Sequence, residues 1–193
     1  MAFVKLTEEG EATGRAAELF EHEMNGRGYV PNYLRLFALR TDVYDAWRKL
    51  IGSIAANMDL RRYELATLAA AQALRSSYCS LAHGMVLRNK FLSEDEMAAA
   101  AAGRADDPVD QGIIHFASKV AKDAAAIEQA DIDSLHGLGL TDEEIFDVAL
   151  AASARAFFSK TTDATGTEPD REYRELLGPE LASSLAVGRS IES

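Results

Sequence analysis

Apolar residues recur along most of this chain every three or four positions, which is the spacing of an amphipathic α-helix. The stretch 42–57 shows the pattern, with apolar side chains at Val43, Trp47, Leu50, Ile51 and Ile54. No alternation of apolar and polar residues continues long enough to make a β-strand. Alanine, the strongest helix former, is frequent throughout. The pattern predicts an all-α fold with essentially no strand.

Turn and capping residues divide the chain into about eight to ten predicted helices. The expected helical segments are 8–25, 31–37, 42–57, 60–74, 76–89, 94–103, 108–122, 131–136 and 141–160, and the tail after them starts helical. The connections are short, and no linker or short-period repeat interrupts them. We expect a compact multi-helix bundle that forms a single domain over residues 1–193.

Particular residues mark the ends of several predicted helices. Thr41 and Asp59 stand at expected N-caps, and Thr141 begins a capping-box pattern. The first helix is expected to end at Asn25-Gly26, because glycine commonly follows the last helical turn.

Composition and charge narrow the class of protein. The chain has 193 residues, of which 48% are hydrophobic, enough for a sizeable core. Its net charge of −11 repels phosphate backbones, so nucleic acid is a poor partner. We see no secretory signal and no apolar stretch long enough to cross a membrane. A single cysteine cannot form an intrachain disulfide, and we expect a cytoplasmic protein.

The segment from Glu64 to Gly84 holds the residues best suited to chemistry. Cys79 is followed four positions later by His83, one helical turn along the same face. If a helix begins near Ser76, Cys79 lies in its first turn, where unpaired N–H groups and the helix dipole favour a thiolate. His83 can take the thiol proton, and Glu64 on the preceding helix can orient His83.

These residues alone do not exclude a purely structural role for Cys79. Cysteine is among the most often buried residue types, and a lone buried cysteine is usually inert. A metal site is less favoured, because one cysteine and one histidine fall short of the ligands that zinc needs. The other histidines, which show no ligand spacing, are His22, His115 and His136. We expect no metal and no cofactor.

Four residues and the stretches around them point to a family. Glu64, Ser76, Cys79 and His83 follow one another at steps of twelve, three and four residues. GYVPNYLRLFALRTDVYDAWRKLIGSI precedes them, and IIHFASKVAKDAAAIEQADIDSLHGLGLTDEEIFDVALAASARAFFSKTTDATG follows. In order and spacing these stretches resemble the carboxymuconolactone decarboxylase and alkylhydroperoxidase D superfamily, in its peroxidase-related branch. The resemblance covers about residues 28–170, with the motif at 64–83.

The resemblance implies both a fold and an activity. The fold is an all-helical bundle of the alkylhydroperoxidase D type that assembles into a homo-oligomer, either a trimer, a dimer or a hexamer. The activity is that of a peroxidase or peroxiredoxin-type antioxidant oxidoreductase, which reduces small-molecule alkyl hydroperoxides with electrons from an external thiol or lipoyl-type reductant. By position, Glu64 and His83 correspond to the proton relay, and Cys79 to the histidine-side cysteine.

This chain departs from the redox motif at Ser76, where the redox members have their other cysteine. A hydroxyl cannot close a disulfide, so the two-thiol cycle is lost. A one-thiol cycle remains, in which Cys79 is oxidised to a sulfenic acid and reduced by an external thiol. Ser76 can still cap the helix and hydrogen-bond to the thiolate.

Two other functions remain open. Some members of the superfamily lack the cysteine pair and act on lactone carboxylates by acid–base chemistry, which here would use His83 and Glu64. A lactone substrate of this kind needs cationic anchors, although arginines beside a motif are more often solvated surface residues. The flanking arginines are Arg61, Arg62, Arg75 and Arg88. The third hypothesis is a non-catalytic helical oligomer that keeps the fold.

Overall fold

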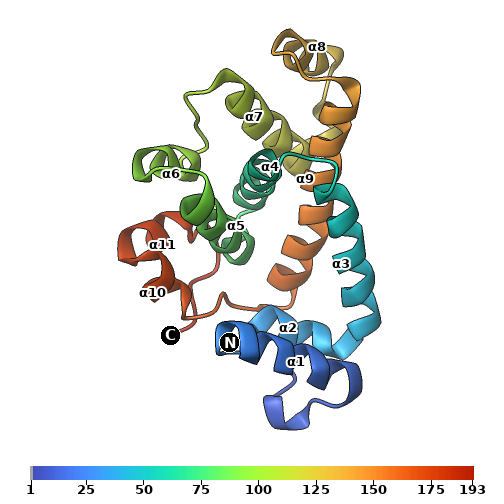
Figure 1. The fold of residues 1–193 in the computed structure, drawn as a ribbon, viewed down its shortest axis with the longest axis vertical. Helices are drawn as coiled ribbons and strands as arrows, with labels where there is room; N and C mark the ends of the chain where they lie inside the picture. The colour runs from blue at the N-terminus through green and yellow to red at the C-terminus, as the bar shows by residue number, and fades with distance from the viewer. Residues whose placement is uncertain (1) are drawn as a thin grey trace.

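The computed structural model describes residues 2–193, and every regular element in that range is helical (Figure 1). The α-helices are α1 (Gly14–Arg27), α2 (Asn32–Phe37), α3 (Thr41–Ala55), α4 (Leu60–Ala73), α5 (Ser77–Lys90), α6 (Glu94–Ala101), α7 (Pro108–Asp123), α8 (Gln129–Gly137), α9 (Asp142–Ala164), α10 (Tyr173–Leu177) and α11 (Pro179–Leu185). Residues 2–193 also include three short 3-10 helices: η1 (Glu9–Glu11), η2 (Ala38–Arg40) and η3 (Ala124–Ala126). The predicted all-α fold class is confirmed.

Two of the expected N-caps are confirmed and one is wrong. Asp59 accepts a hydrogen bond from the backbone N–H of Arg62, and Thr141 forms the predicted capping box with Glu144. Thr41 does not cap α3. Because η2 runs directly into α3, Thr41 already has helical backbone angles and is the first helical residue.

The first helix is shorter at its start and longer at its end than predicted. Backbone that is extended at Ala12 and Thr13 separates η1 from α1. At the other end, α1 continues through Gly26 and stops at Gly28, which has a left-handed φ of 82°. Glycine adopts this conformation without the steric cost that a side chain would add, so the helix ends there.

Helix α4 lies at the centre of the bundle (Figure 1). It packs against α5, α7 and α9, and the nine residues 63–71 of α4 are all buried. A helix buried on all sides needs small residues wherever a neighbour approaches closely. Ala66, Ala69 and Ala70 meet that need and are at most 2% exposed. The motif residue Glu64 is thereby placed in the interior of the molecule.

The apolar stripe of α3 is only partly covered. Trp47 and Ile54 are buried as predicted, but Val43 and Leu50 are 40% and 51% exposed. Together with Phe157 of α9 they line an apolar groove of about 480 Å³. An open apolar groove of this kind is compatible with the expected homo-oligomer, which stays a prediction. None of the helices in residues 2–193 has both the length and the apolar character needed to cross a bilayer.

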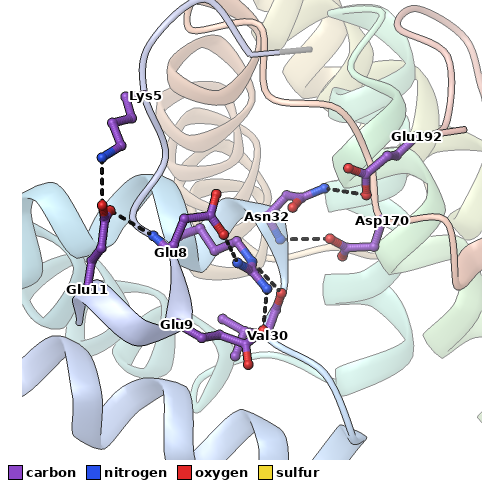
Figure 2. Close-up of polar contacts among 9 residues, drawn as sticks. Lys5, Glu8, Glu9, Glu11, Val30, Asn32, Asp170 and Glu192 are labelled. Atoms are coloured by element: carbon purple, nitrogen blue, oxygen red, sulfur yellow. Dashed lines mark hydrogen bonds and ion pairs between the residues drawn. The ribbon is translucent and has the colours of Figure 1, made fainter.

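The C-terminal tail docks on the bundle through a polar network around Asp170. The backbone N–H of Asn32 donates to Asp170 over 2.7 Å, and the Asn32 side-chain amide donates to Glu192 over 3.1 Å (Figure 2). From the other side, the Tyr78 hydroxyl donates to Asp170 over 2.6 Å. Burial raises the pKa of Asp170 to about 6. The tail is thus tied to the residue that precedes Cys79 in α5.

The tail also contacts the turn between α4 and α5. The backbone N–H of Gly188 donates to the Ser77 hydroxyl over 2.8 Å, and Arg75 Nε donates to the Val187 carbonyl over 3.4 Å. Arg75 has a φ of 58°, which is a left-handed conformation that residues with side chains rarely adopt. A Cβ on Gly188 would lie 1.9 Å from the Arg75 carbonyl oxygen. Only glycine fits beside this turn.

The Gly188→Ala variant is expected to be destabilised by about 1–3 kcal/mol or more, because the new methyl group collides with backbone that cannot rotate away. The matched control is Gly52→Ala, at an exposed position inside α3 where an added Cβ meets nothing within 4 Å. That control should gain about 1 kcal/mol from helix propensity. Urea unfolding measures the free energy of unfolding of both variants. Equal values would show that Gly188 is not packed closely against the Arg75 carbonyl.

Candidate functional site

Cys79 lies in the first turn of α5, as the motif predicts. The helix begins at Ser77, with Ser76 at the N-cap position in extended backbone. Cys79 is 1% exposed and has no disulfide partner. The expected side-chain cap is not formed, because the Ser76 hydroxyl lies beside Asp163 without a hydrogen bond of ordinary geometry. The Ser76 side chain therefore accepts no hydrogen bond from the backbone N–H groups in the first turn of α5.

Glu64 and His83 form a hydrogen-bonded pair. His83 Nδ1 lies 2.6 Å from Glu64 Oε2, and both side chains are largely buried. Burial and the positive charge of Arg155 lower the pKa of His83, although Glu64 opposes them. The histidine is therefore neutral at neutral pH, with the Nδ1–H donating to the glutamate. His83 lies one helical turn beyond Cys79 on α5, so the Glu64–His83 pair lies one turn along the helix from the thiol.

Arg155 joins this group from α9, a position that the motif does not cover. Its side chain is 4% exposed, and Nη1 donates to Cys79 Sγ over 3.6 Å. The guanidinium also stacks within 5.5 Å of the Trp47 ring centroid and 5.6 Å of the Phe158 centroid. One signal of its role is visible in the sequence, where Arg155 is the single charged residue in the largely apolar run AASARAFF. Periodicity alone does not show where that charge points.

Several opposing effects set the charge of Arg155. Burial acts to lower its pKa, but the nearby Cys79 sulfur and the Tyr63 hydroxyl outweigh burial and raise the pKa above its ordinary value. The guanidinium is therefore charged. Its Nε is buried without a hydrogen-bond partner, as are the hydroxyls of Ser80 and Ser159. The surroundings of the thiol thus contain unused hydrogen-bonding capacity, which is uncommon in a protein interior.

The arginines that flank the motif are engaged elsewhere. Arg61 lies 2.5 Å from Asp110, and Arg62 lies 2.8 Å from Glu144. The other two, Arg75 and Arg88, are exposed and each donates a hydrogen bond to a backbone carbonyl, that of Val187 and that of Leu176. None of the four contacts Glu64, Cys79 or His83 in any hydrogen bond or ion pair of the described chain. The anchors expected for a lactone carboxylate are therefore not at the site.

Aromatic side chains wall off the thiol from solvent. Cys79 packs in one apolar cluster with Phe37, Tyr44, Trp47 and Phe158. The Trp47 and Phe158 rings lie 4.4 Å apart between centroids. Trp47 also lines the groove between α3 and α9, so its indole stands between that groove and the Arg155–Cys79 pair. A reagent that approaches from the groove must pass this ring.

The chemistry open to the site follows from its residues. In the part of the chain that the structure describes, no three His, Cys, Asp or Glu side chains gather as a metal site would require. What the site does hold is a thiol beside a fixed positive charge and a neutral imidazole hydrogen-bonded to a carboxylate. A thiol can act as a nucleophile or be oxidised, and the imidazole can accept and return a proton.

Comparison with known proteins supports the resemblance seen in the sequence. Residues 41–108 match the model of the Carboxymuconolactone decarboxylase family. Among curated proteins, none matches the sequence significantly.

Several solved structures are similar to this protein over most of both chains. A peroxidase-related protein from Ralstonia eutropha, described as an alkylhydroperoxidase AhpD core, is 23% identical with a TM-score of 0.75, covering 89% of this chain and 94% of its own. A peroxidase-related protein from Silicibacter is 21% identical with a TM-score of 0.77, covering 89% and 93%. A debrominase in complex with 2,3,4-tribromopyrrole is 16% identical with a TM-score of 0.73, covering 90% and 95%. At these identities the likeness establishes the fold.

Proposed function

We propose that this chain is a member of the carboxymuconolactone decarboxylase and alkylhydroperoxidase D-like superfamily that reduces hydroperoxides with Cys79 as its single reactive thiol. The observation that carries the proposal is the grouping of Cys79 in the first turn of α5 with the hydrogen-bonded Glu64–His83 pair one turn beyond. A buried cysteine with only a packing role has no need of a neighbouring relay.

The oxidation step balances with the residues present. His83 accepts the thiol proton, and Glu64 stabilises the imidazolium that results. The Cys79 sulfur attacks one oxygen of the hydroperoxide, the O–O bond breaks, and the sulfur becomes a sulfenic acid. The departing alkoxide takes the proton from His83 and leaves as an alcohol. The sulfur gives up two electrons, and the hydroperoxide receives them.

The return step needs a partner, because Ser76 supplies no second thiol. An external thiol condenses with the sulfenic acid, which forms a mixed disulfide and releases water. A second thiol equivalent attacks the mixed disulfide, which restores Cys79 and releases the oxidised reductant. A lipoyl-type dithiol supplies both equivalents in one molecule. Because Cys79 is 1% exposed, the site must open for either reactant to reach the sulfur.

The His83→Gln variant tests the relay. Glutamine retains a hydrogen-bonding side chain but cannot shuttle the proton, so thiol-dependent hydroperoxide reduction should fall by about 100-fold. The matched control is His115→Gln on the exposed surface of α7, which should act as the unmodified protein does. Steady-state turnover with an alkyl hydroperoxide and a small dithiol measures the effect. Equal turnover in the two variants would rule out a relay through His83.

Acid–base chemistry on a lactone or another small molecule is the second candidate. It is favoured by the neutral His83 hydrogen-bonded to Glu64 and by the absence of a second motif cysteine. The debrominase among the similar structures is a protein of this fold with a different activity. An activity that needs His83 and Glu64 but not Cys79 would establish this second candidate and replace the first.

A further inference from the structure

Arg155 is a buried cation without a carboxylate to match it. Its guanidinium is 4% exposed, and no ion pair between Arg155 and a carboxylate occurs in residues 2–193. Glu64, the carboxylate of the site, is hydrogen-bonded to His83 and forms no ion pair with Arg155. An unmatched charge in the interior is costly, and proteins generally pair it.

The polar groups beside the guanidinium are the Cys79 sulfur and the Tyr63 hydroxyl, and burial raises the pKa of Tyr63, which leaves the sulfur as the group that can become an anion. Arg155 Nη1 lies 3.6 Å from Sγ, within hydrogen-bonding range for sulfur. A thiol is a poor acceptor, whereas a thiolate is an anion that both satisfies the donor and cancels the charge. The Trp47 and Phe158 rings on the guanidinium stabilise a cation through their π faces but supply no negative charge.

We propose that Arg155 is the anion-binding residue of this site and that the anion it holds is the Cys79 thiolate, which forms when His83 accepts the thiol proton. The proposal rests on the proposed function in taking Cys79 as the reactive atom. Arg155 then touches the reacting sulfur and is a catalytic residue alongside Glu64 and His83. Its unpartnered Nε–H is a second donor in the same planar group, which can serve the oxygen that oxidation adds.

The proposal also narrows the class of substrate. With the thiolate matched to Arg155, the site has no buried cation left for a substrate carboxylate, since Arg61 and Arg62 pair with Asp110 and Glu144. Glu64 adds a negative charge nearby. The reactant that fits is therefore uncharged, with an apolar portion that suits the aromatic wall of Trp47 and Phe158. A neutral alkyl or aryl hydroperoxide fits this description, and an anionic lactone does not.

Alkylation of Cys79 tests the charge pairing without any peroxide. The rate with the neutral reagent iodoacetamide at neutral pH should fall about tenfold or more in Arg155→Met, because the thiolate loses its hydrogen bond and its counter-charge. Arg155→Lys keeps the charge and should recover much of the rate. Arg88→Met, which removes an exposed arginine of α5, should react as the unmodified protein does. The ultraviolet absorbance of the thiolate should fall in the same order.

The alkylation rate of Arg155→Met could also change because the variant has a looser structure. A double-mutant cycle of melting temperatures therefore tests the same charge pairing independently. Cys79→Ser leaves the guanidinium without an anion, so it should lower the melting temperature more in the presence of Arg155 than in the Arg155→Met background. Equal reductions in the two backgrounds, together with unchanged alkylation in folded Arg155→Met, would overturn the proposal. Neither measurement depends on peroxide turnover, so a failed peroxidase assay with a positive cycle would count against the proposed function alone.

Discussion

Replacing Cys79 by alanine is expected to abolish thiol-dependent hydroperoxide reduction while leaving the fold in place. The sulfur is the atom that attacks the peroxide, and in residues 2–193 the structure offers no other cysteine to take its place. We expect turnover to fall by at least about 1,000-fold. Because only one sulfur atom is removed from the core, the stability cost is on the order of 1 kcal/mol. Turnover and circular dichroism, measured on the same preparation, separate the two effects.

The result with Cys79→Ala also decides between the two candidate functions. A variant that stays folded and loses all peroxide reduction supports the thiol cycle. If peroxide reduction continues in the folded variant, the sulfur is not the reactive atom, and the Glu64–His83 pair becomes the centre of an acid–base enzyme. The choice matters because the two mechanisms share that pair and differ only in the use of the thiol.

Restoring the second thiol with Ser76→Cys is expected to create a peroxide-driven internal disulfide. Positions 76 and 79 lie at the start of α5, and two residues between cysteines at a helix start is a spacing that closes. The Ser76 hydroxyl has no hydrogen bond of ordinary geometry, so the exchange for a thiol breaks none. One equivalent of peroxide should consume both thiols together, and a reductant should return both, as counted with a thiol reagent.

Ser80→Cys is the matched control for this experiment. Ser80 is equally buried and its hydroxyl is also unpartnered, but it is the immediate neighbour of Cys79 in the helix. Adjacent helical residues point in different directions, so this pair should not close. If both thiols of folded Ser76→Cys survive oxidation, the site is not a redox pair that has lost one member, and the acid–base or non-catalytic hypothesis gains weight.

The parts of the fold that local sequence governs could be predicted. Asp59 and Thr141 cap their helices because a side chain and a nearby backbone N–H decide the outcome. The Glu64–His83 contact was predictable for a related reason, since a motif spacing and two consecutive helices bring the residues together. Two expectations, a single domain over residues 1–193 and a cytoplasmic location, stay predictions.

The parts that depend on distant segments could not be predicted. Arg155 and Cys79 are 76 residues apart, and no spacing rule joins an arginine of α9 to the first turn of α5. Helical periodicity grouped Val43 and Leu50 with the core, but it does not reveal which faces another element will cover. The role of Gly188 was invisible for the same reason, since its need for glycine arises only from the approach of the Arg75 carbonyl.

The contact between Gly188 and the start of α5 has a consequence for how the protein is made. Ser77 and Gly188 are 111 residues apart, so the start of α5 lacks its contact with the tail until Gly188 has been synthesised. Arg155 likewise leaves the ribosome long after the thiol. A nascent chain therefore presents Cys79 before the groups that hold it exist. A protein whose translation stops after α9 carries the motif and Arg155 but lacks the tail contact at the start of α5.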